Sequence, residues 1–285
     1  MRITKHYRFA GLDFNVEMSE EVAYLEERNL TEFRAEPGLE PHRFVCDYVD
    51  DLPEPTGTMT IRQPNFTLYE VPEGHVRYIG GQNSYVRAEH RGKSHTVLVK
   101  KNPYNSRIGV KTLLESMEVE HLIARNDGFV FHCSYIDREG EAILFTAPSE
   151  TGKSTQADLW HQYRDAEIIN GDRAAIRLSD GKLLAEGIPF AGSSQYCKNR
   201  SLPIRAIVYL GQAPQTTIRK LRGYEAFSKI WEGVSVNTWD REDLERVSAV
   251  VQKVASEIPV YHMPCTPDES AVIALEEALR KQVSP

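Results

Sequence analysis

Residues 142–155 read AILFTAPSETGKST, and this stretch decides the fold expected for the second half of the chain. Its first five residues are apolar except for a final threonine, as in a buried strand, and the residues from Lys153 onward read as the start of a helix. A short polar loop joins the two and ends in Gly152-Lys153-Ser154. A strand, a loop ending in Gly-Lys-Ser and a helix, in that order, are typical of a P-loop, which binds nucleotide phosphates.

The residue types of this loop suit phosphate binding. Backbone N–H groups and the positive end of the helix dipole hold phosphate oxygens. Lys153 would bring a positive charge to the β- and γ-phosphates, and the hydroxyl of Ser154 would bind Mg²⁺. We therefore expect ATP to be bound by Ser149, Glu150, Thr151, Gly152, Lys153, Ser154 and Thr155.

Two positions depart from the pattern G-x-x-x-x-G-K-[ST]. Ala147 stands where the first glycine is expected, and the loop tolerates it if the backbone angle φ is negative there. Glu150 places a carboxylate beside a site built for anions. Its repulsion would weaken ATP binding unless the side chain swings outward.

The chain around the loop mixes helices and strands from residue 109 to residue 285. A helix is predicted by apolar positions that fall on one face, at Val110, Leu113, Leu114, Met117, His121 and Leu122. Strands are predicted at 129–136, 142–146, 168–170, 206–210 and 260–263, with a hairpin joining 174–178 to 183–186 through Asp180-Gly181. Further helices are predicted at 224–231, 241–257 and 268–281. This mixture indicates a nucleotide-binding, kinase-like P-loop domain at 109–285.

Residues 1–108 are predicted to form a β-rich region. Short runs of β-branched and aromatic residues lie at 58–61, 66–71, 75–79, 85–89 and 95–100. Turns of a few residues separate them, so the strands are expected to be antiparallel neighbours. The fold class expected for the whole chain is α/β (α+β), with this antiparallel β-meander packed on the P-loop domain. The meander serves either as a substrate platform or as a scaffold that completes the core, and we favour the scaffold.

Composition excludes some classes of protein. The chain has 285 residues and a formal net charge of −7. Nucleic-acid binding is not expected, because phosphate backbones require a basic face. No run approaches the ~18 apolar residues of a membrane span, and the N-terminus shows no apolar signal-peptide core. The four cysteines form no CxxC pair, so we expect reduced thiols in a cytoplasmic protein; whether it forms a homo-oligomer is left open.

The surroundings of the loop resemble a known superfamily. Phe131-His132-Cys133, the strand 141–146, the loop itself and the segment 168–173 (IINGDR) resemble the HPr kinase/phosphorylase and phosphoenolpyruvate carboxykinase superfamily. The resemblance covers about residues 128–177 and extends less clearly to about 215. Smaller HPr-kinase-like proteins, among them the kinases that phosphorylate lasso peptides, look more similar to this chain than the central metabolic enzymes do. The positions that match the pattern are His132, Ser149, Gly152, Lys153, Ser154, Asp172 and Arg173.

The resemblance implies catalytic or metal-binding roles for Asp172 and His132. In HPr kinases two adjacent aspartates end the second strand, and the first of them is the usual candidate for the general base. Gly171 replaces that aspartate here, so Asp172 would bind Mg²⁺, accept the proton of the substrate hydroxyl, or do both through a metal-bound water. His132 would orient the acceptor or share its proton; the alternative is a hydrogen-bonded core histidine.

We expect a kinase that uses ATP and Mg²⁺ and acts on a hydroxyl, with Asp172, Lys153 and His132 as catalytic residues and with Ser154 and Asp172 as metal ligands. The acceptor is a serine of a protein or peptide, or a small molecule. Two alternatives stay open: a nucleotide-binding regulatory protein without turnover, and a carboxykinase-like enzyme acting on a small oxo-acid. Lys198 and Arg200, in the loop at 187–200, would either contact a phosphate or acidic acceptor or lie solvated at the surface.

Overall fold

The computed structural model describes residues 1–19, 28–101, 110–190, 192 and 196–281. Backbone contacts divide the chain into two units, Met1–Val119 and Glu120–Pro285. The boundary expected after residue 108 lies outside the described residues. Both units contain a sheet, and the fold is mixed α/β.

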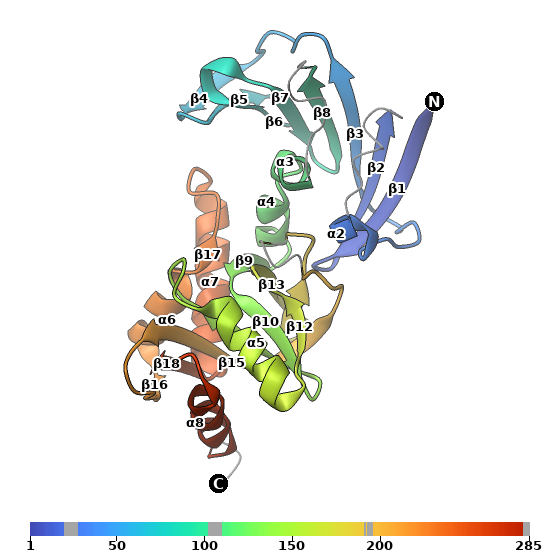
Figure 1. Cartoon of the computed structure of the whole chain (residues 1–285). Helices are drawn as coiled ribbons and strands as arrows, with labels where there is room; N and C mark the ends of the chain where they lie inside the picture. The colour runs from blue at the N-terminus through green and yellow to red at the C-terminus, as the bar shows by residue number, and fades with distance from the viewer. Residues whose placement is uncertain (20–27, 102–109, 191, 193–195, 282–285) are drawn as a thin grey trace. The chain divides into compact units, whose positions relative to one another are not determined.

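The first unit is an eight-stranded sheet in the order β1-β2-β3-β8-β7-β6-β5-β4, seen in blue to teal in Figure 1. All five predicted strands are present as β4–β8, and they pair antiparallel as expected. The meander is nevertheless only part of the sheet, because β2 pairs parallel with β3, and β3 pairs parallel with β8. The elements are β1 (Arg2–Phe9), β2 (Leu12–Ser19), α2 (Arg28–Thr31), β3 (His42–Val49), β4 (Thr58–Arg62), β5 (Phe66–Val71), β6 (Gly74–Ile79), the 3₁₀ helix η1 (Gly81–Asn83), β7 (Val86–Arg91), β8 (Ser94–Lys100) and α3 (Val110–Ser116).

The second unit is a ten-stranded sheet in the order β12-β10-β11-β15-β14-β13-β9-β17, with β18 also pairing with β15 and β16 pairing with β18. Its elements are α4 (Val119–Ala124), β9 (Gly128–His132), β10 (Ser134–Arg138), β11 (Glu141–Thr146), α5 (Lys153–Arg164), β12 (Glu167–Asn170), β13 (Arg173–Ser179), β14 (Lys182–Gly187), β15 (Ser201–Gln212), β16 (Arg219–Leu221), α6 (Gly223–Trp231), β17 (Val234–Ser235), α7 (Arg241–Glu257), β18 (Val260–Cys265) and α8 (Glu269–Arg280).

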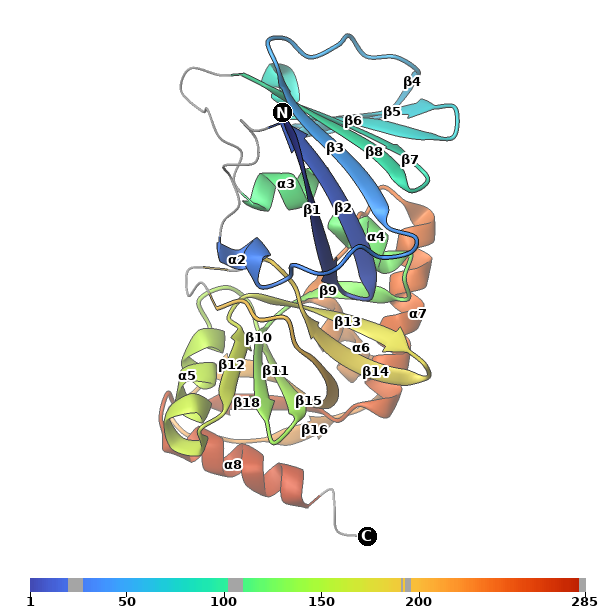
Figure 2. The same cartoon turned by 90° about the vertical axis from the view of Figure 1, so that its right-hand side faces the viewer.

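Helices cover both faces of this sheet, which explains why the central strand β11 is apolar at four successive positions, from Ala142 to Phe145 (Figure 2). Along β11, Ile143 and Phe145 pack toward α5 and α8, whereas Ala142 and Leu144 pack toward α6 and α7. Successive side chains of a strand point to opposite faces, so a strand buried on both sides needs an apolar residue at each position. The resulting central position of β11 fixes where the following loop begins.

Two predicted elements are each divided in two. The strand expected at 129–136 is broken at Cys133 into β9 and β10, which pair with different neighbours. The helix expected from Val110 to Leu122 is broken between α3 and α4, where Glu118 has a φ of 51°. A left-handed residue cannot continue a right-handed helix, so the apolar periodicity spans two helices rather than one. No helix in the described part of the chain is long and apolar enough to cross a lipid bilayer.

Candidate functional site

The predicted phosphate loop connects β11 to α5, as the sequence indicated. Gly152 has a φ of 111°, which favours a residue without a Cβ, and α5 begins at the next residue. The ammonium group of Lys153 folds back over the loop. It donates to the carbonyl oxygens of Ala147 at 3.1 Å and of Pro148 at 3.3 Å. The loop and the first helical residue therefore form one closed hydrogen-bonded unit.

The two departures from the P-loop pattern have different structural consequences. Ala147 is buried and lies outside the left-handed region, which meets the condition under which alanine replaces glycine there. Glu150 is exposed and has a φ of 64°, a conformation that costs a residue other than glycine roughly 1–2 kcal/mol. Its carbonyl oxygen accepts a hydrogen bond from Nε2 of Gln212 at 3.4 Å. A glycine would therefore suit the backbone at position 150 as well as the charge of the site.

Asp172 lies in the turn between β12 and β13, and the buried side chain of Asn170 shapes this turn. The Oδ1 atom of Asn170 accepts from the backbone N–H groups of Asp172 at 2.9 Å and Arg173 at 3.0 Å. Its Nδ2 atom donates to the carbonyl oxygens of Ile188 at 3.1 Å and Phe190 at 2.8 Å. Asn170 thus positions the carboxylate of Asp172. It was not among the predicted site residues, although asparagine before Gly-Asp is a recognisable turn signal.

His132 is brought to Asp172 by pairing between strands. It ends β9 directly opposite Arg173 of β13, and its Nε2 atom lies 3.4 Å from Oδ1 of Asp172. The ring is 35% exposed, so His132 is not a fully enclosed core residue. Its backbone is held from both sides: its N–H donates to the carbonyl oxygen of Gly233, and its carbonyl oxygen accepts from Oγ1 of Thr146.

Electrostatics join these groups. The hydrogen bond from His132 lowers the pKa of Asp172 against the effect of partial burial, and the charges of Arg173 and Lys153 lower it further. Burial lowers the pKa of Lys153, while the carboxylate of Asp172 raises it. The structure therefore places His132 against Asp172, with Lys153 near enough for its charge to change the pKa of that carboxylate.

The remaining residues of the predicted phosphate loop are accessible to a ligand. Ser149, Ser154 and Thr155 are exposed, while Thr151 and Gly152 are partly exposed. Ser154 and Thr155 belong to the first turn of α5, beside the N–H groups that a helix leaves without internal partners.

Arg173 closes the other side of Asp172. Its Nε atom lies 3.3 Å from Oδ2 of Asp172, its Nη1 atom donates to Glu120 at 3.3 Å, and its guanidinium group lies over the ring of Phe190. Gly192 passes close by, since a Cβ at that position would lie 3.0–3.2 Å from atoms of the Asp172 side chain.

Lys198 and Arg200 are engaged in surface ion pairs. Lys198 lies 2.6 Å from Glu167, and Arg200 lies 2.8 Å from Asp137. The structure thus supports the solvated-surface reading of both residues. Residues 191 and 193–195 of the same loop lie outside the described part of the chain.

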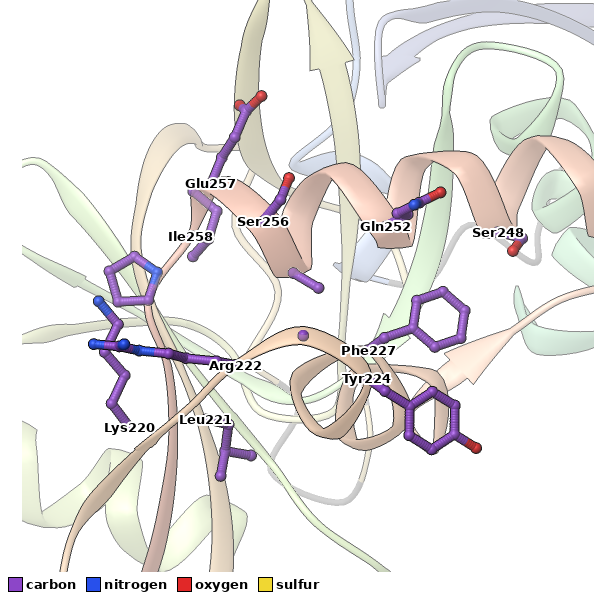
Figure 3. A pocket seen from close by; sticks show the side chains of 13 residues that line it. Lys220, Leu221, Arg222, Tyr224, Phe227, Ser248, Gln252, Ser256, Glu257 and Ile258 are labelled. Carbon is purple, nitrogen blue, oxygen red and sulfur yellow. The ribbon is translucent and has the colours of Figure 1, made fainter.

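A cavity of about 810 Å³ lies elsewhere in the second unit, between the start of α6 and the C-terminal half of α7 (Figure 3). Its walls carry Tyr224 and Phe227 from α6 and Gln252 and Ser256 from α7. None of its lining residues belongs to the phosphate loop or to the turn of Asp172. The chemistry of the site therefore rests on the loop and the turn rather than on this cavity.

Comparison with known proteins gives a distant structural similarity and no sequence match. No protein-family model matches the chain, and no curated protein matches it. A solved structure similar to it is that of the Hpr(Ser) kinase/phosphatase from Coxiella burnetii. The similarity covers 54% of this chain and 89% of that chain, with 11% sequence identity and a TM-score of 0.34.

Proposed function

We propose that this protein is a kinase that uses ATP and Mg²⁺ to phosphorylate a hydroxyl group. The observation that carries the proposal is the group formed by Lys153, Asp172 and His132. A lysine closes the loop at the start of a helix, and a carboxylate near enough to change its pKa lies beside a histidine. Phosphoryl transfer needs positioning and neutralisation of charge more than covalent chemistry by the protein, and this group supplies both.

The phosphates would lie at the N-terminus of α5. Its free N–H groups and those of the loop would hold phosphate oxygens. Two of the three ammonium protons of Lys153 are used by the carbonyl groups of Ala147 and Pro148, which leaves one for a phosphate oxygen.

The donor set fits Mg²⁺. This ion prefers hard oxygen ligands, and the hydroxyl of Ser154 and the carboxylate of Asp172 are such ligands. When bound, Mg²⁺ would neutralise charge on the phosphates. We favour this role for Asp172 over that of general base, because it is the one carboxylate at this turn once Gly171 replaces its neighbour.

His132 would then take the proton of the acceptor. Its ring is partly exposed and is fixed by the contact with Asp172, so the acceptor hydroxyl can approach it. A neutral imidazole is a suitable base near neutral pH. The acceptor is a serine of a protein or peptide, or a small molecule with a hydroxyl group.

A regulatory protein that binds nucleotide without turnover is the second candidate. Glu150 beside the phosphate site and Gly171 in place of a catalytic aspartate both favour it. The carboxykinase-like alternative needs a second metal and an arginine for the substrate carboxylate. Among the described residues, neither group of possible metal ligands includes a residue of the phosphate loop or of the turn of Asp172, and Arg173 is engaged with Asp172 and Glu120, so this alternative receives less support.

Two measurements test the proposal. Calorimetry with Mg·ATP should show binding to the wild-type chain. Transfer of labelled γ-phosphate from ATP to a mixture of peptide and small-molecule hydroxyl acceptors should then be at least 100-fold slower in a His132→Gln variant, since a positioned base contributes about 10²–10⁴-fold. Binding without transfer to any acceptor would favour the regulatory protein, and failure to bind ATP would refute both.

A further inference from the structure

Four of the nine histidines gather in the sheet of the first unit, whereas the phosphate loop belongs to the second unit. They are His42 of β3, His75 of β6, His90 of β7 and His95 of β8. Antiparallel pairing places His75 directly opposite His90, and His90 directly opposite His95. Three neighbouring strands thus bring imidazole rings side by side, with ring centroids 5.0–5.1 Å apart between these pairs.

Glu118 adds a carboxylate to this row. It follows α3 in the left-handed conformation already described, and only 1% of its side chain is exposed. Its Oε2 atom accepts a hydrogen bond from Nε2 of His75 at 2.7 Å. Its Oε1 atom lies 3.8 Å from Nε2 of His90 and 3.8 Å from Nη1 of Arg77, and it accepts no hydrogen bond from the described residues.

A buried carboxylate oxygen without a hydrogen bond is costly, and such groups in native proteins call for an explanation. Buried charges in proteins are paired or coordinate metals, and a cation beside Oε1 of Glu118 would give this oxygen the partner that it lacks among the described residues.

We propose that His75, His90 and Glu118 bind a divalent transition-metal ion of the Zn²⁺ class. Two imidazole nitrogens and one carboxylate are a common ligand set for Zn²⁺. The three ligand atoms all lie within 4.8 Å of one another. Ligand atoms around a tetrahedral Zn²⁺ are ~3.3 Å apart, given bonds of about 2.0–2.1 Å. His75 Nε2 lies 2.7 Å from Oε2 of Glu118 and His90 Nε2 lies 3.8 Å from Oε1, so with one carboxylate oxygen facing each imidazole the first separation would lengthen and the second would shorten, each by about half an ångström.

The neighbouring histidines provide the support that metal-binding histidines require. His90 Nδ1 lies 2.9 Å from His95 Nδ1, and His95 Nε2 lies 3.1 Å from His42 Nδ1. If the Nε2 lone pair of His90 faces the metal, its Nδ1–H donates to His95, whose Nε2–H donates to His42. A ligand histidine usually donates its second N–H in this way.

Arg77 places a positive charge beside the proposed cation site. Its guanidinium group lies over the ring of Phe66 and is too far from Glu118 for a hydrogen bond. Its positive charge would repel a bound cation, so Arg77→Met is expected to strengthen Zn²⁺ binding. If Glu118 served only to neutralise Arg77, the same substitution would create no such gain.

A second group of possible ligands, His121, Asp240 and Asp243, serves as a control. There Arg125 lies 3.0 Å from Asp240 and 2.9 Å from Asp243, and His121 lies 2.7 Å from Asp243, so the acids are already satisfied. We expect that group to bind no ion.

The test is a titration of the full chain with Zn²⁺ in competition with a chromophoric chelator, without nucleotide. We expect one equivalent bound by the wild type, affinity lowered at least tenfold in His75→Gln and about 10–100-fold in His95→Gln, and no change in His121→Gln. Co²⁺ in place of Zn²⁺ should give visible absorption that His75→Gln abolishes. His75 is partly exposed, so its glutamine variant is the mildest of the ligand changes, and circular dichroism checks its fold.

Binding of no Zn²⁺ by the wild type would overturn the proposal whatever the variants do. Equal binding by the wild type and a folded His75→Gln variant would overturn it too. The proposal does not depend on the kinase function, since its site lies in the other unit.

Discussion

Replacing Lys153 by methionine removes the ammonium group of the phosphate loop and keeps a long side chain at a buried position. Only 8% of Lys153 is exposed, so its aliphatic stem packs in the protein and methionine should fill much the same space. Two ammonium protons bond the carbonyl groups of Ala147 and Pro148, and the third is available to a phosphate. The substitution therefore removes one charged hydrogen bond to the nucleotide.

Such a bond contributes about 1.5–3 kcal/mol, which corresponds to a loss of roughly 10- to 150-fold in affinity for Mg·ATP. Isothermal calorimetry would measure the loss, and thermal unfolding would show that the variant is folded. Lys253→Met is a matched control, because it removes the same charge from an exposed ion pair with Glu257 on α7. Unchanged ATP affinity in a folded Lys153→Met protein would refute the assignment of this loop as a phosphate site.

Three further changes test other parts of the second unit. Glu150→Gly should tighten Mg·ATP binding a few-fold at low salt, because it removes a carboxylate that repels the phosphates, and calorimetry would measure the change. An unchanged affinity at low salt would mean that the carboxylate lies too far from the phosphates to repel them. Asp172→Asn should weaken the Mg²⁺ dependence of ATP binding, whereas an unaltered dependence would return Asp172 to the role of base. Neighbouring groups lower the pKa of Asp172 below its usual 3.8 in the folded protein. The stability that its carboxylate contributes is therefore present above pH 3.8 and is lost as the pH falls through the lowered pKa. In denaturant titrations, Asp172→Asn should accordingly lose less stability on acidification than the wild type does. Trp160→Ala should lower the free energy of unfolding by about 3–5 kcal/mol, since the ring is buried between α5 and the sheet. Tyr163→Ala, on the exposed side of the same helix, should lower it far less. Equal losses in the two variants would contradict this packing.

Local sequence determined the features that depend on neighbouring residues. The order of strand, loop and helix at 142–155 follows from an apolar run, a glycine that permits a positive φ and a helix start. The hairpin through Asp180-Gly181 follows from two residues that adopt positive φ, as observed at 49° and 76°. The helix at 241–257 begins where Asp240 accepts hydrogen bonds from the N–H groups of the first turn. Each of these signals lies within a few residues of the structure that it specifies.

Tertiary structure decided which distant residues meet. Pairing of β9 with β13 places His132 beside Asp172, forty positions later in the chain, and the break at Cys133 sends β9 and β10 to different neighbours. Likewise, no local sequence signal predicts that Glu118, which follows α3, lies beside His75 of β6 and His90 of β7. Strand register and the burial of both sheet faces set these contacts, and both depend on the packing of the whole unit. An apolar run of sequence indicates that a strand is buried, but it does not indicate which strand pairs with it.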